Sequence, residues 1–448
     1  MSYETIALLM FGAMLVLMLT GQRIFAMCGV VGAAAALLIA FGDGRSLQFA
    51  LETPFNAVFK LFSWHVMLTL PMFVYMGYML SESGIAQELY RAMHVWFGRL
   101  PGGLAIGTIV LMIIISCING LSVAGIAIGS AIAIPEMLRR GYDKVLITGV
   151  VQGGSTLGLL LPPSVVAVLY SVIARQSVAD MWLAGIGPGL LMAVIFIAYI
   201  SIRVKLNPKL APPVAEEELN MPLREKLKLL GAGAIPMGIF AVMLGSFLSG
   251  SASLLESSAI GATLATLSCW LKGRLTFSLM HRTARQTMGV TAMFMWVILG
   301  ALAFSAVFDG IGAVRAIENI FLHNLELTPW QIVFLMQVSF IVLGIFMDDT
   351  AMLIIVAPLY IPLVARLDLG IDNHMIWFGV LYVINCQISY LSPPFGYNLF
   401  LMRSLAPPEI TLMDIYRSIN PFMIMMTLTM LAIMIFPDIA MWIPNALK

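Results

Sequence analysis

The sequence predicts an all-α membrane protein with many transmembrane segments, and three observations lead to this fold class. Of its 448 residues, 60% are hydrophobic and only 10% are charged, and its mean hydropathy is +0.97. Globular domains in water contain roughly 25% charged residues. Apolar runs approach or reach the roughly 17 to 25 residues that an α-helix needs to cross a bilayer. About ten to twelve such segments follow one another, so we expect a helical, multi-pass chain.

The apolar runs are the expected membrane helices, in chain order. The first begins soon after Met1 without a preceding basic region or cleavage site, so we expect a permanent span rather than a removable signal. The single prolines Pro101, Pro236 and Pro329 are interpreted as helix starts or kinks. The clearest runs are Ile6–Thr20, Phe25–Phe41, Trp182–Ile202, Leu229–Phe247, Trp330–Met347 and Phe422–Phe436.

The sequence also argues against several classes of protein. No basic stripe interleaved with aromatic residues occurs, so nucleic acid is not an expected partner. Neither H-E-x-x-H nor G-x-S-x-G occurs, and the adjacent acids Asp348 and Asp349 are not the two-helix dyad of an aspartyl protease, so we do not expect an enzyme. Four cysteines lack metal-ligand spacing and are expected to be buried small side chains. They are Cys28, Cys117, Cys269 and Cys386.

Two polar, basic segments indicate the orientation of the chain. Arg203–Lys228 contains prolines and charges of both signs, and it divides the chain into halves. Two apolar spans later, the stretch KGRLTFSLMHRTARQ follows, from Lys272 to Gln286. Two crossings return a chain to the same side of a membrane. Because basic loops favour the cytoplasm, both segments are predicted to lie there.

The two halves share one pattern. In the first, ISCINGLSVAG is followed by GGSTLGLLLPPSVV; in the second, GIFMDDTAM is followed by VINCQISYLSPPFGYNLF. Each half thus has an apolar run interrupted by small polar residues and a later run broken at Pro-Pro. The separation of Asn119 from Pro162 nearly equals that of Asp348 from Pro393. Repeated halves with segments interrupted at matching positions indicate the binding site of a secondary transporter.

The breaks predict a site for an ion and an anion. Proline has no N–H, and the glycines Gly153, Gly154 and Gly158 allow the helix to unwind, so carbonyl groups should lose their intrahelical partners. Together with nearby hydroxyls these oxygens suit a small hard cation such as Na⁺, and the N-termini of the half-helices suit a carboxylate. The nearby polar side chains are Ser155, Thr156 and Ser164 in the first half, and Asn385, Gln387, Ser389, Ser392 and Asn398 in the second.

The interrupted runs are expected to be helical hairpins that enter the membrane and turn back. The first turns around Asn119, Gly120 and Ser122, and the second around Asp348, Asp349 and Thr350. Acids within a membrane are functional hypotheses by default, but capping of the following half-helix or contact with water would explain these two equally well. Glu256, in SASLLESSAIGA, is the other isolated acid. A structural hydrogen bond to a neighbouring helix is as good an interpretation of it as a role in transport.

These motifs resemble a known family, the large membrane subunit of the tripartite ATP-independent periplasmic (TRAP) transporters, along essentially the whole chain. The resemblance depends on seven stretches in the right order rather than on any one of them. They are LPGGLAIG, IPEMLRRGYDK, GGSTLGLLLPPSVV, AGIGPGLL, the Glu256 segment, GIFMDDTAM and SPPFGYNLF.

The resemblance implies an elevator-type transporter of the ion-transporter superfamily, with two repeats of inverted topology and no cofactor other than Na⁺ as the coupling ion. One Na⁺ site would comprise Asn119, Gly120, Ser122, Gly154, Ser155 and Pro162. The other would comprise Asp348, Asp349, Thr350, Gln387, Ser389 and Pro393. The substrate would lie at Ser164, Ser392, Gly396 and Asn398.

The resemblance also implies partners and a location. A separate small four-helix membrane subunit and a periplasmic binding protein that delivers an organic anion are expected, in a bacterial inner membrane. The chain opens with the first helix of the large subunit, so we expect the small subunit to be another polypeptide. The implied parts are scaffold helices in 1–54, a first repeat in 55–202, a cytoplasmic linker in 203–228, scaffold helices in 229–284 and a second repeat in 285–448.

The sequence departs from the family pattern at two places. At the first tip, Asn119, Gly120, Leu121 and Ser122 replace the Gly-Ser-Ser cluster of many members. In VINCQISYLSPP no glycine separates Asn385 from the prolines, so unwinding is expected to begin later than in the first half. The alternative within transport is a stand-alone Na⁺-coupled dicarboxylate or citrate symporter of the same superfamily. A passive channel would also fit the composition, but channels rarely need a hairpin in each half.

Overall fold

The computed structural model is helical, and the residues it describes contain no strand. These residues are 3–19, 24–42, 65–82, 84–120, 122–212, 222–310, 327–345, 349–393 and 396–447, with short pieces between 48 and 59. The chain divides into two compact units. The first comprises Met1–Leu68, Met288–Phe340 and Asp349–Met375, and the second comprises Thr69–Thr287, Ile341–Asp348 and Ile376–Lys448.

The first unit is built from helices that approach one another closely at small residues. A Cβ added to Gly32 would lie 3.3 Å from the Phe304 Cα, so the missing side chain helps α2 and α14 to approach closely. The Ser339 and Tyr360 hydroxyls hydrogen-bond at 2.6 Å and join α16 to α17. Its helices are α1 (Tyr3–Leu19), α2 (Ile24–Gly42), the second part of α14 (Phe277–Gly310), most of α16 (Pro329–Gly344) and α17 (Asp349–Val364).

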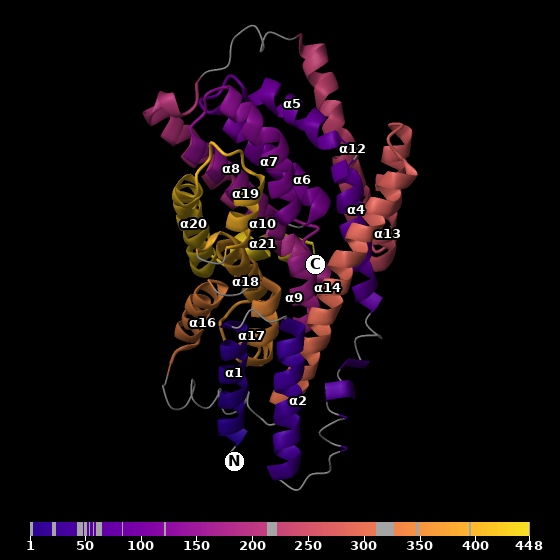
Figure 1. Cartoon of the computed structure of the whole chain (residues 1–448), viewed down its shortest axis with the longest axis vertical. Coiled ribbons are helices and arrows are strands. Elements are labelled where there is room, and N and C mark those ends of the chain that lie inside the picture. The colour runs from indigo at the N-terminus through magenta and orange to yellow at the C-terminus, as the bar shows by residue number, and fades with distance from the viewer. Residues whose placement is uncertain are drawn as a thin grey trace. The chain divides into compact units, whose positions relative to one another are not determined.

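The second unit holds most of the chain and both Pro-Pro stretches. Its first helices are α4 (Thr69–Glu82), α5 (Ile85–Phe97), α6 (Gly103–Asn119), α7 (Ser122–Arg139), α8 (Lys144–Thr156), α9 (Val165–Ala174) and α10 (Val178–Leu206). After these come α12 (Leu223–Leu248), α13 (Leu254–Leu271), the start of α14, α18 (His374–Leu391), α19 (Tyr397–Leu405), α20 (Leu412–Ile435) and α21 (Asp438–Ala446). Short 3-10 turns occur at η1 (His65–Leu68), η2 (Leu157–Leu159) and η3 (Pro208–Leu210). Figure 1 shows α5 lying beside α6, with α7 and α8 next to them.

The helices agree with the apolar runs of the sequence. Five described helices are long and apolar enough to cross a bilayer, and five shorter apolar helices of 10–17 residues accompany them. Together they agree with the expected ten to twelve apolar segments that approach or reach the length of a span. As expected, Cys28, Cys269 and Cys386 are buried, and they form no disulfide bond among the described residues. The side chain of Cys117 lies outside the described residues.

The glycines of the first break pack against neighbours instead of unwinding the helix, which corrects the sequence interpretation. Gly153 and Gly154 lie inside α8, which stays helical to Thr156. A Cβ on Gly154 would lie 2.9 Å from the Met112 side chain, and one on Gly153 would collide with the Phe422 ring. The small residues therefore let α6 and α20 approach α8, and the α-helix ends because of the residues after Thr156.

Glu256 has a structural role at the start of its own helix. It lies in the first turn of α13, where Ser253 and Glu256 form a reciprocal capping box. The Ser253 N–H donates to the Glu256 carboxylate at 2.7 Å, and the Glu256 N–H donates to the Ser253 hydroxyl at 3.3 Å. The acid is exposed and caps its own helix, so the expected hydrogen bond to a neighbouring helix is wrong.

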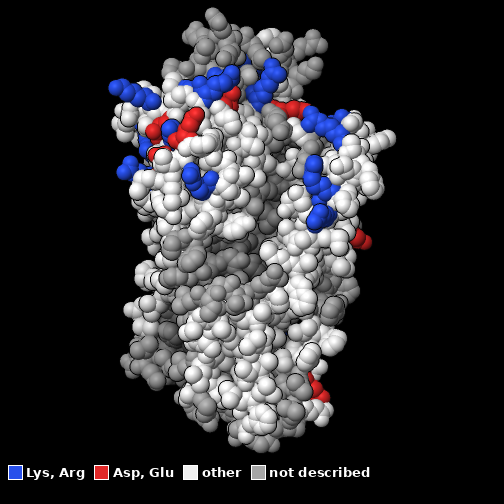
Figure 2. Space-filling view, viewed as in Figure 1, with Lys and Arg blue, Asp and Glu red and all other residues white. Residues whose placement is uncertain are grey.

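Basic side chains gather at one end of the second unit (Figure 2). The loops at this end contact each other: the Asp143 N–H donates to the Leu210 carbonyl at 2.9 Å, and the Lys144 ammonium donates to the Glu409 carbonyl at 2.8 Å. The helix α10 has 29 residues and so spans about 43 Å. It joins this end to the turn near Arg175 and is long enough to cross a bilayer. Basic residues at the gathered end include Arg139, Arg140, Lys144, Lys205 and Lys209.

Candidate functional site

The first Pro-Pro stretch breaks a helix, as the sequence predicts. Asp143 caps the start of α8, because its carboxylate accepts the Leu146 N–H at 2.9 Å. The α-helix ends at Thr156, a 3-10 turn follows, and α9 starts only at Val165. Pro162 and Pro163 lie in the non-helical part and are joined by a cis peptide bond. Every residue from Leu146 to Tyr170 is buried, so this break lies inside the protein.

The backbone of the break is satisfied mostly by its own side chains. Ser164 caps α9: its hydroxyl accepts the Ala167 N–H at 3.1 Å and donates to the Leu159 carbonyl. The Trp182 indole of α10 donates to the Ser164 carbonyl at 3.3 Å. In the same helix, Gly185 lacks the Cβ that would collide with the Leu160 carbonyl. The expected substrate residue Ser164 therefore stabilises the break itself.

The turn between α6 and α7 lies directly against this break. Gly120 is buried with a φ of 62°, a left-handed conformation that favours glycine. Its carbonyl accepts the Val165 N–H at 3.4 Å, at the start of α9. A Cβ on Gly120 would collide with the Pro163 carbonyl oxygen. The turn and the break are thus close enough that residue 120 has no space for a larger side chain.

Three fully buried polar side chains meet beside this turn, and we call them the Ser–Ser–Asn cluster: Ser122, Ser155 and Asn398. The two hydroxyl oxygens lie 3.3 Å apart. The Asn398 amide nitrogen lies 3.0 Å from the Ser122 hydroxyl and 3.5 Å from the Ser155 hydroxyl. Ser155 in turn donates to the Gln152 carbonyl at 2.7 Å. The cluster therefore joins the first turn, the first break and the helix that follows the second break.

The pairing in this cluster differs from what the repeat pattern suggests. The two serines were expected in one Na⁺ site and Asn398 among the substrate residues, but the structure brings all three together. Asn398 lies one residue after the start of α19, whose N-terminal neighbour is Gly396. The contact joins the two halves of the chain, whereas the sequence interpretation paired residues within each half.

A second contact between the halves involves Gln387 of α18. Its amide N–H donates to the Thr156 carbonyl at 2.9 Å. Thr156 is the last residue of α8, so Gln387 contacts the backbone where this helix ends. The Gln387 amide oxygen is buried and has no hydrogen-bond partner among the described residues. A buried, unpaired amide oxygen is available to a ligand.

The second break begins closer to its prolines, which confirms the expectation drawn from the missing glycine. The helix α18 continues to Leu391, two residues before Pro393. Ser389 and Ser392 are buried and donate to carbonyls of their own helix, both at 2.8 Å. Ser389 also lies opposite Gly344, where an added Cβ would collide with its hydroxyl. The Gly396 N–H donates to the Ser392 carbonyl at 2.8 Å.

Several predicted site residues lie wholly or partly outside the described residues. Asp348 is not described, and the side chains of Asp349 and Thr350, which open α17, are not described either. The same holds for the side chain of Asn119, the last residue of α6. The predicted second Na⁺ site therefore stays a prediction. Of its other members, Pro393 is exposed, whereas Gln387 and Ser389 are buried.

Among the described residues, the site presents neutral oxygens as possible ligand atoms. Within the described ranges, no group of three or more His, Cys, Asp and Glu side chains could hold a metal ion. The Ser–Ser–Asn cluster, the Gln387 oxygen and the carbonyls of the break present hydroxyl, amide and peptide oxygens instead. Such oxygens are the ligands of hard cations, and the N-termini of α9 and α19 favour anions. No sequence pattern indicated the cross-half pairing directly, although Asn398 and Gln387 are polar residues in apolar surroundings.

These features define a multi-pass membrane protein in which broken helices hold a polar site between apolar helices. Residues 11–439 match the family described as Tripartite ATP-independent periplasmic transporter, DctM component. The chain belongs to this family. It is 28% identical over 420 residues to the C4-dicarboxylate TRAP transporter large permease protein of Pseudomonas aeruginosa, covering 93% of each chain.

Two further comparisons agree with this. The ectoine/5-hydroxyectoine TRAP transporter large permease protein of Ruegeria pomeroyi is 25% identical over 416 residues, which cover 92% of this chain and 93% of that one. The crystal structure of the Alcanivorax borkumensis YdaH transporter is similar with a TM-score of 0.58, 15% identity and 89% of each chain covered. At this identity, the likeness to YdaH concerns the fold alone.

Proposed function

We propose that this chain is the membrane-embedded subunit of a Na⁺-coupled uptake system for an organic acid that a periplasmic binding protein delivers. Membership of the TRAP large-permease family supports this proposal. Relatives are named for C4-dicarboxylate and for ectoine, and we propose a carboxylate as the group that the site recognises. A small four-helix membrane subunit would complete the complex.

The single observation that carries the proposal is the Ser–Ser–Asn cluster at the first break. Its side chains are buried and uncharged, and the Ser122 hydroxyl oxygen lies 3.3 Å from the Ser155 hydroxyl oxygen and 3.4 Å from the Asn398 amide oxygen. If the Asn398 amide turns its oxygen toward the two serines, three oxygens face one point, and Na⁺ prefers such ligands. The Gly120 carbonyl and the backbone of the break lie beside them. We propose a first Na⁺ site of Asn119, Gly120, Ser122, Gly154, Ser155 and Pro162, with Asn398 as a further ligand.

The second Na⁺ site and the substrate site follow from the same chemistry. We propose Asp348, Asp349, Thr350, Gln387, Ser389 and Pro393 for the second Na⁺. The buried and unpaired oxygen of Gln387 supports its part in this site. The carboxylate of the substrate would lie near Ser392, Gly396 and Asn398, where the N-terminus of α19 presents free N–H groups. Ser164 would support this site by capping α9.

The orientation and the transport cycle are also part of the proposal. The basic end of the second unit would face the cytoplasm of a bacterium whose inner membrane holds the chain, in agreement with the positive-inside rule. The α6–α7 and α16–α17 pairs would be re-entrant hairpins of two inverted repeats. In an elevator mechanism, scaffold helices in 1–54 and 229–284 would stay fixed, while the repeats in 55–202 and 285–448 carry the site across.

Uptake into proteoliposomes tests this function. The chain is reconstituted with its small subunit and binding protein, and radiolabelled dicarboxylates are supplied under an inward Na⁺ gradient. We expect uptake that requires all three components and the gradient. Uptake by the chain alone would instead favour a stand-alone symporter, and uptake without a Na⁺ gradient would refute the coupling.

Two matched variants test where the Na⁺ ion binds. Ser155→Ala removes one cluster hydroxyl, whereas Ser171→Ala removes a buried hydroxyl that only bonds the Ala167 carbonyl of its own helix. A hydrogen bond or ligand contact to a charged group contributes about 1.5–3 kcal/mol, which corresponds to a roughly 10- to 100-fold change in affinity. We expect the Na⁺ concentration for half-maximal uptake to rise by this factor in Ser155→Ala. Equal Na⁺ activation in both variants would refute the placement of the ion.

A further inference from the structure

A cavity lined by charged and apolar side chains lies far from the site at the breaks. It has a volume of about 400 Å³ and lies between α5 and the C-terminal end of α7. Its position on α7 is about 20 Å along the helix from Ser122, because 14 residues rise 1.5 Å each. The cavity is therefore separate from the Ser–Ser–Asn cluster. It is lined by Tyr90, Arg91, His94, Val95, Ile132, Glu136 and Arg140.

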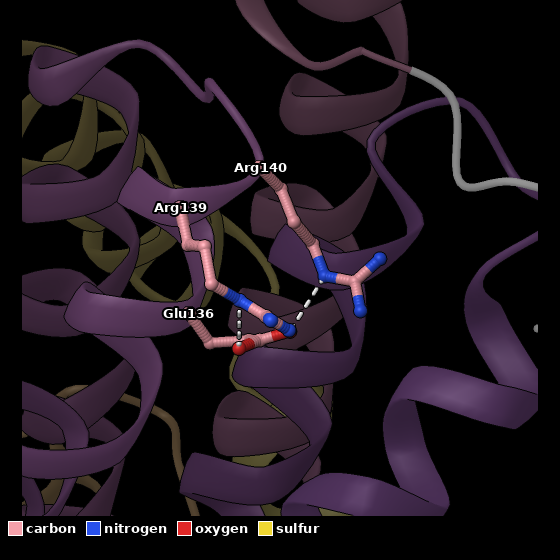
Figure 3. A network of polar contacts seen from close by, with 3 residues as sticks. All are labelled: Glu136, Arg139 and Arg140. Carbon is pink, nitrogen blue, oxygen red and sulfur yellow. Dashed lines mark hydrogen bonds and ion pairs between the residues drawn. The ribbon is translucent and has the colours of Figure 1, made fainter.

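The charges around the cavity favour an anion. Glu136, the one lining acid, is held by two arginines: Arg139 donates to it at 2.8 and 3.1 Å, and Arg140 donates through Nε at 2.7 Å (Figure 3). Burial opposes ionisation of Glu136, but these hydrogen bonds and charges keep its pKa below the ordinary value. Arg139 is largely exposed and is sufficient to balance this acid. Arg140 and Arg91 then leave the lining with positive charge.

Arg91 is a basic side chain of the lining that is exposed to solvent. It lines the cavity, and it makes no hydrogen bond or ion pair with any residue that the structure describes. Arg140 donates through its Nε to Glu136, and Figure 3 shows its guanidinium beside that carboxylate. A guanidinium presents N–H donors in a fixed plane that matches the oxygens of a phosphate.

The position of the cavity indicates where its ligand comes from. The helix α5 is strongly amphipathic and lies at the basic end of the unit, where Trp96 donates to the Lys226 carbonyl at 3.2 Å. Amphipathic helices with tryptophan and basic residues typically lie at the membrane interface. The cavity also has apolar lining from Val95 and Ile132 beside its polar groups. A phospholipid has the same combination, a charged phosphate followed by glycerol and acyl carbons.

We propose that this cavity binds the phosphate headgroup of an anionic phospholipid from the cytoplasmic leaflet. Arg91 and Arg140 would bind the phosphate oxygens, Tyr90 and His94 would donate further hydrogen bonds, and Val95 and Ile132 would contact the first carbons of the lipid. Basic pockets between helices at the cytoplasmic side are known to suit such headgroups. The lipid would fix α5 against α7 and is distinct from the transported anion.

Native mass spectrometry of the purified chain tests the proposal, with dioleoyl phosphatidylglycerol and dioleoyl phosphatidylcholine as the probes. We expect one phosphatidylglycerol per chain to bind in preference to phosphatidylcholine. Arg91→Gln should weaken that binding about tenfold, because it removes a charge-assisted hydrogen bond. Lys205→Gln removes the same charge from an exposed position at the same end and should leave the binding unchanged.

Two further experiments test whether the cavity is the site and whether a lipid occupies it. Ile132→Trp fills the apolar side of the cavity without removing charge, and it should also abolish the bound phosphatidylglycerol. Displacement of the lipid by millimolar inorganic phosphate would show that a soluble phosphate is the occupant and would overturn the lipid assignment. Equal lipid binding by wild type, Arg91→Gln and Ile132→Trp would show that the cavity is not the site.

Discussion

Replacing Gly120 with alanine tests whether the turn between α6 and α7 must touch the broken helix. Gly120 has a φ of 62°, and a Cβ there would collide with the Pro163 carbonyl oxygen. Gly273 provides a matched control, because its φ is 67° and an added Cβ would have no atom within 4 Å. Both substitutions therefore cost the strain of a left-handed alanine, about 1–2 kcal/mol. Only Gly120→Ala also has a steric overlap.

The steric overlap at residue 120 determines how much Na⁺ affinity Gly120→Ala is expected to lose. In a closely packed interior it is relieved only if the turn and the break separate by roughly an ångström. Ser122 would then move away from Ser155 and Asn398, whose contacts of 3.0–3.4 Å would exceed hydrogen-bonding distance. Loss of two oxygen ligands at about 1.5–3 kcal/mol each lowers Na⁺ affinity more than about 100-fold.

Two assays separate this effect from simple destabilisation. Thermal unfolding in detergent without Na⁺ should show Gly273→Ala weakened by the backbone strain alone and Gly120→Ala weakened further by the overlap. Added Na⁺ should then stabilise wild type and Gly273→Ala but not Gly120→Ala, and uptake in proteoliposomes should fail only in Gly120→Ala. Equal Na⁺ stabilisation and equal uptake by the two variants would refute the argument that this contact forms the site.

Three further predictions concern polar groups of the second unit. Gln387→Leu removes the hydrogen bond to the Thr156 carbonyl, so we expect reduced Na⁺-dependent uptake and a loss of stability of about 0.5–1.5 kcal/mol, and wild-type values would contradict this. Ser253→Ala removes the cap of α13 and should cost about 1 kcal/mol in unfolding free energy, whereas Thr263→Ala, at an exposed position of the same helix, should not. Because the pKa of Glu136 is lowered, its ion pairs stabilise the folded state fully above about pH 4.3. That stabilisation is lost as the pH falls through the lower folded-state pKa, where the thermal stabilities of wild type and Glu136→Gln should converge.

The local features of the fold were predictable because they depend on single residues. Proline lacks an N–H and ends a helix wherever it occurs twice, so the breaks at Pro162 and Pro393 could be predicted from the sequence. The absence of glycine before Pro393 likewise predicted the longer course of α18. The Ser253–Glu256 capping box has the S-x-x-E pattern, and this signal was present in the sequence although the acid was interpreted differently.

The contacts between distant elements could not be predicted in the same way. Gly153 packs against the Phe422 ring, so its role depends on which helix lies beside α8, and no local pattern carries that information. The same holds for Asn398, whose partners Ser122 and Ser155 belong to the other half of the chain. A repeat pattern indicates which residues are equivalent, but it does not indicate which of them meet.

The contact between Asn398 and Ser122 has a consequence for synthesis. Asn398 follows Ser122 by 276 residues, so the two serines enter the membrane long before the amide that they contact has been made. Until then their hydroxyls have no cross-half partner, and a buried hydroxyl without a partner is unfavourable in an apolar environment. A chain truncated before residue 398 would insert its first helices without completing this cluster.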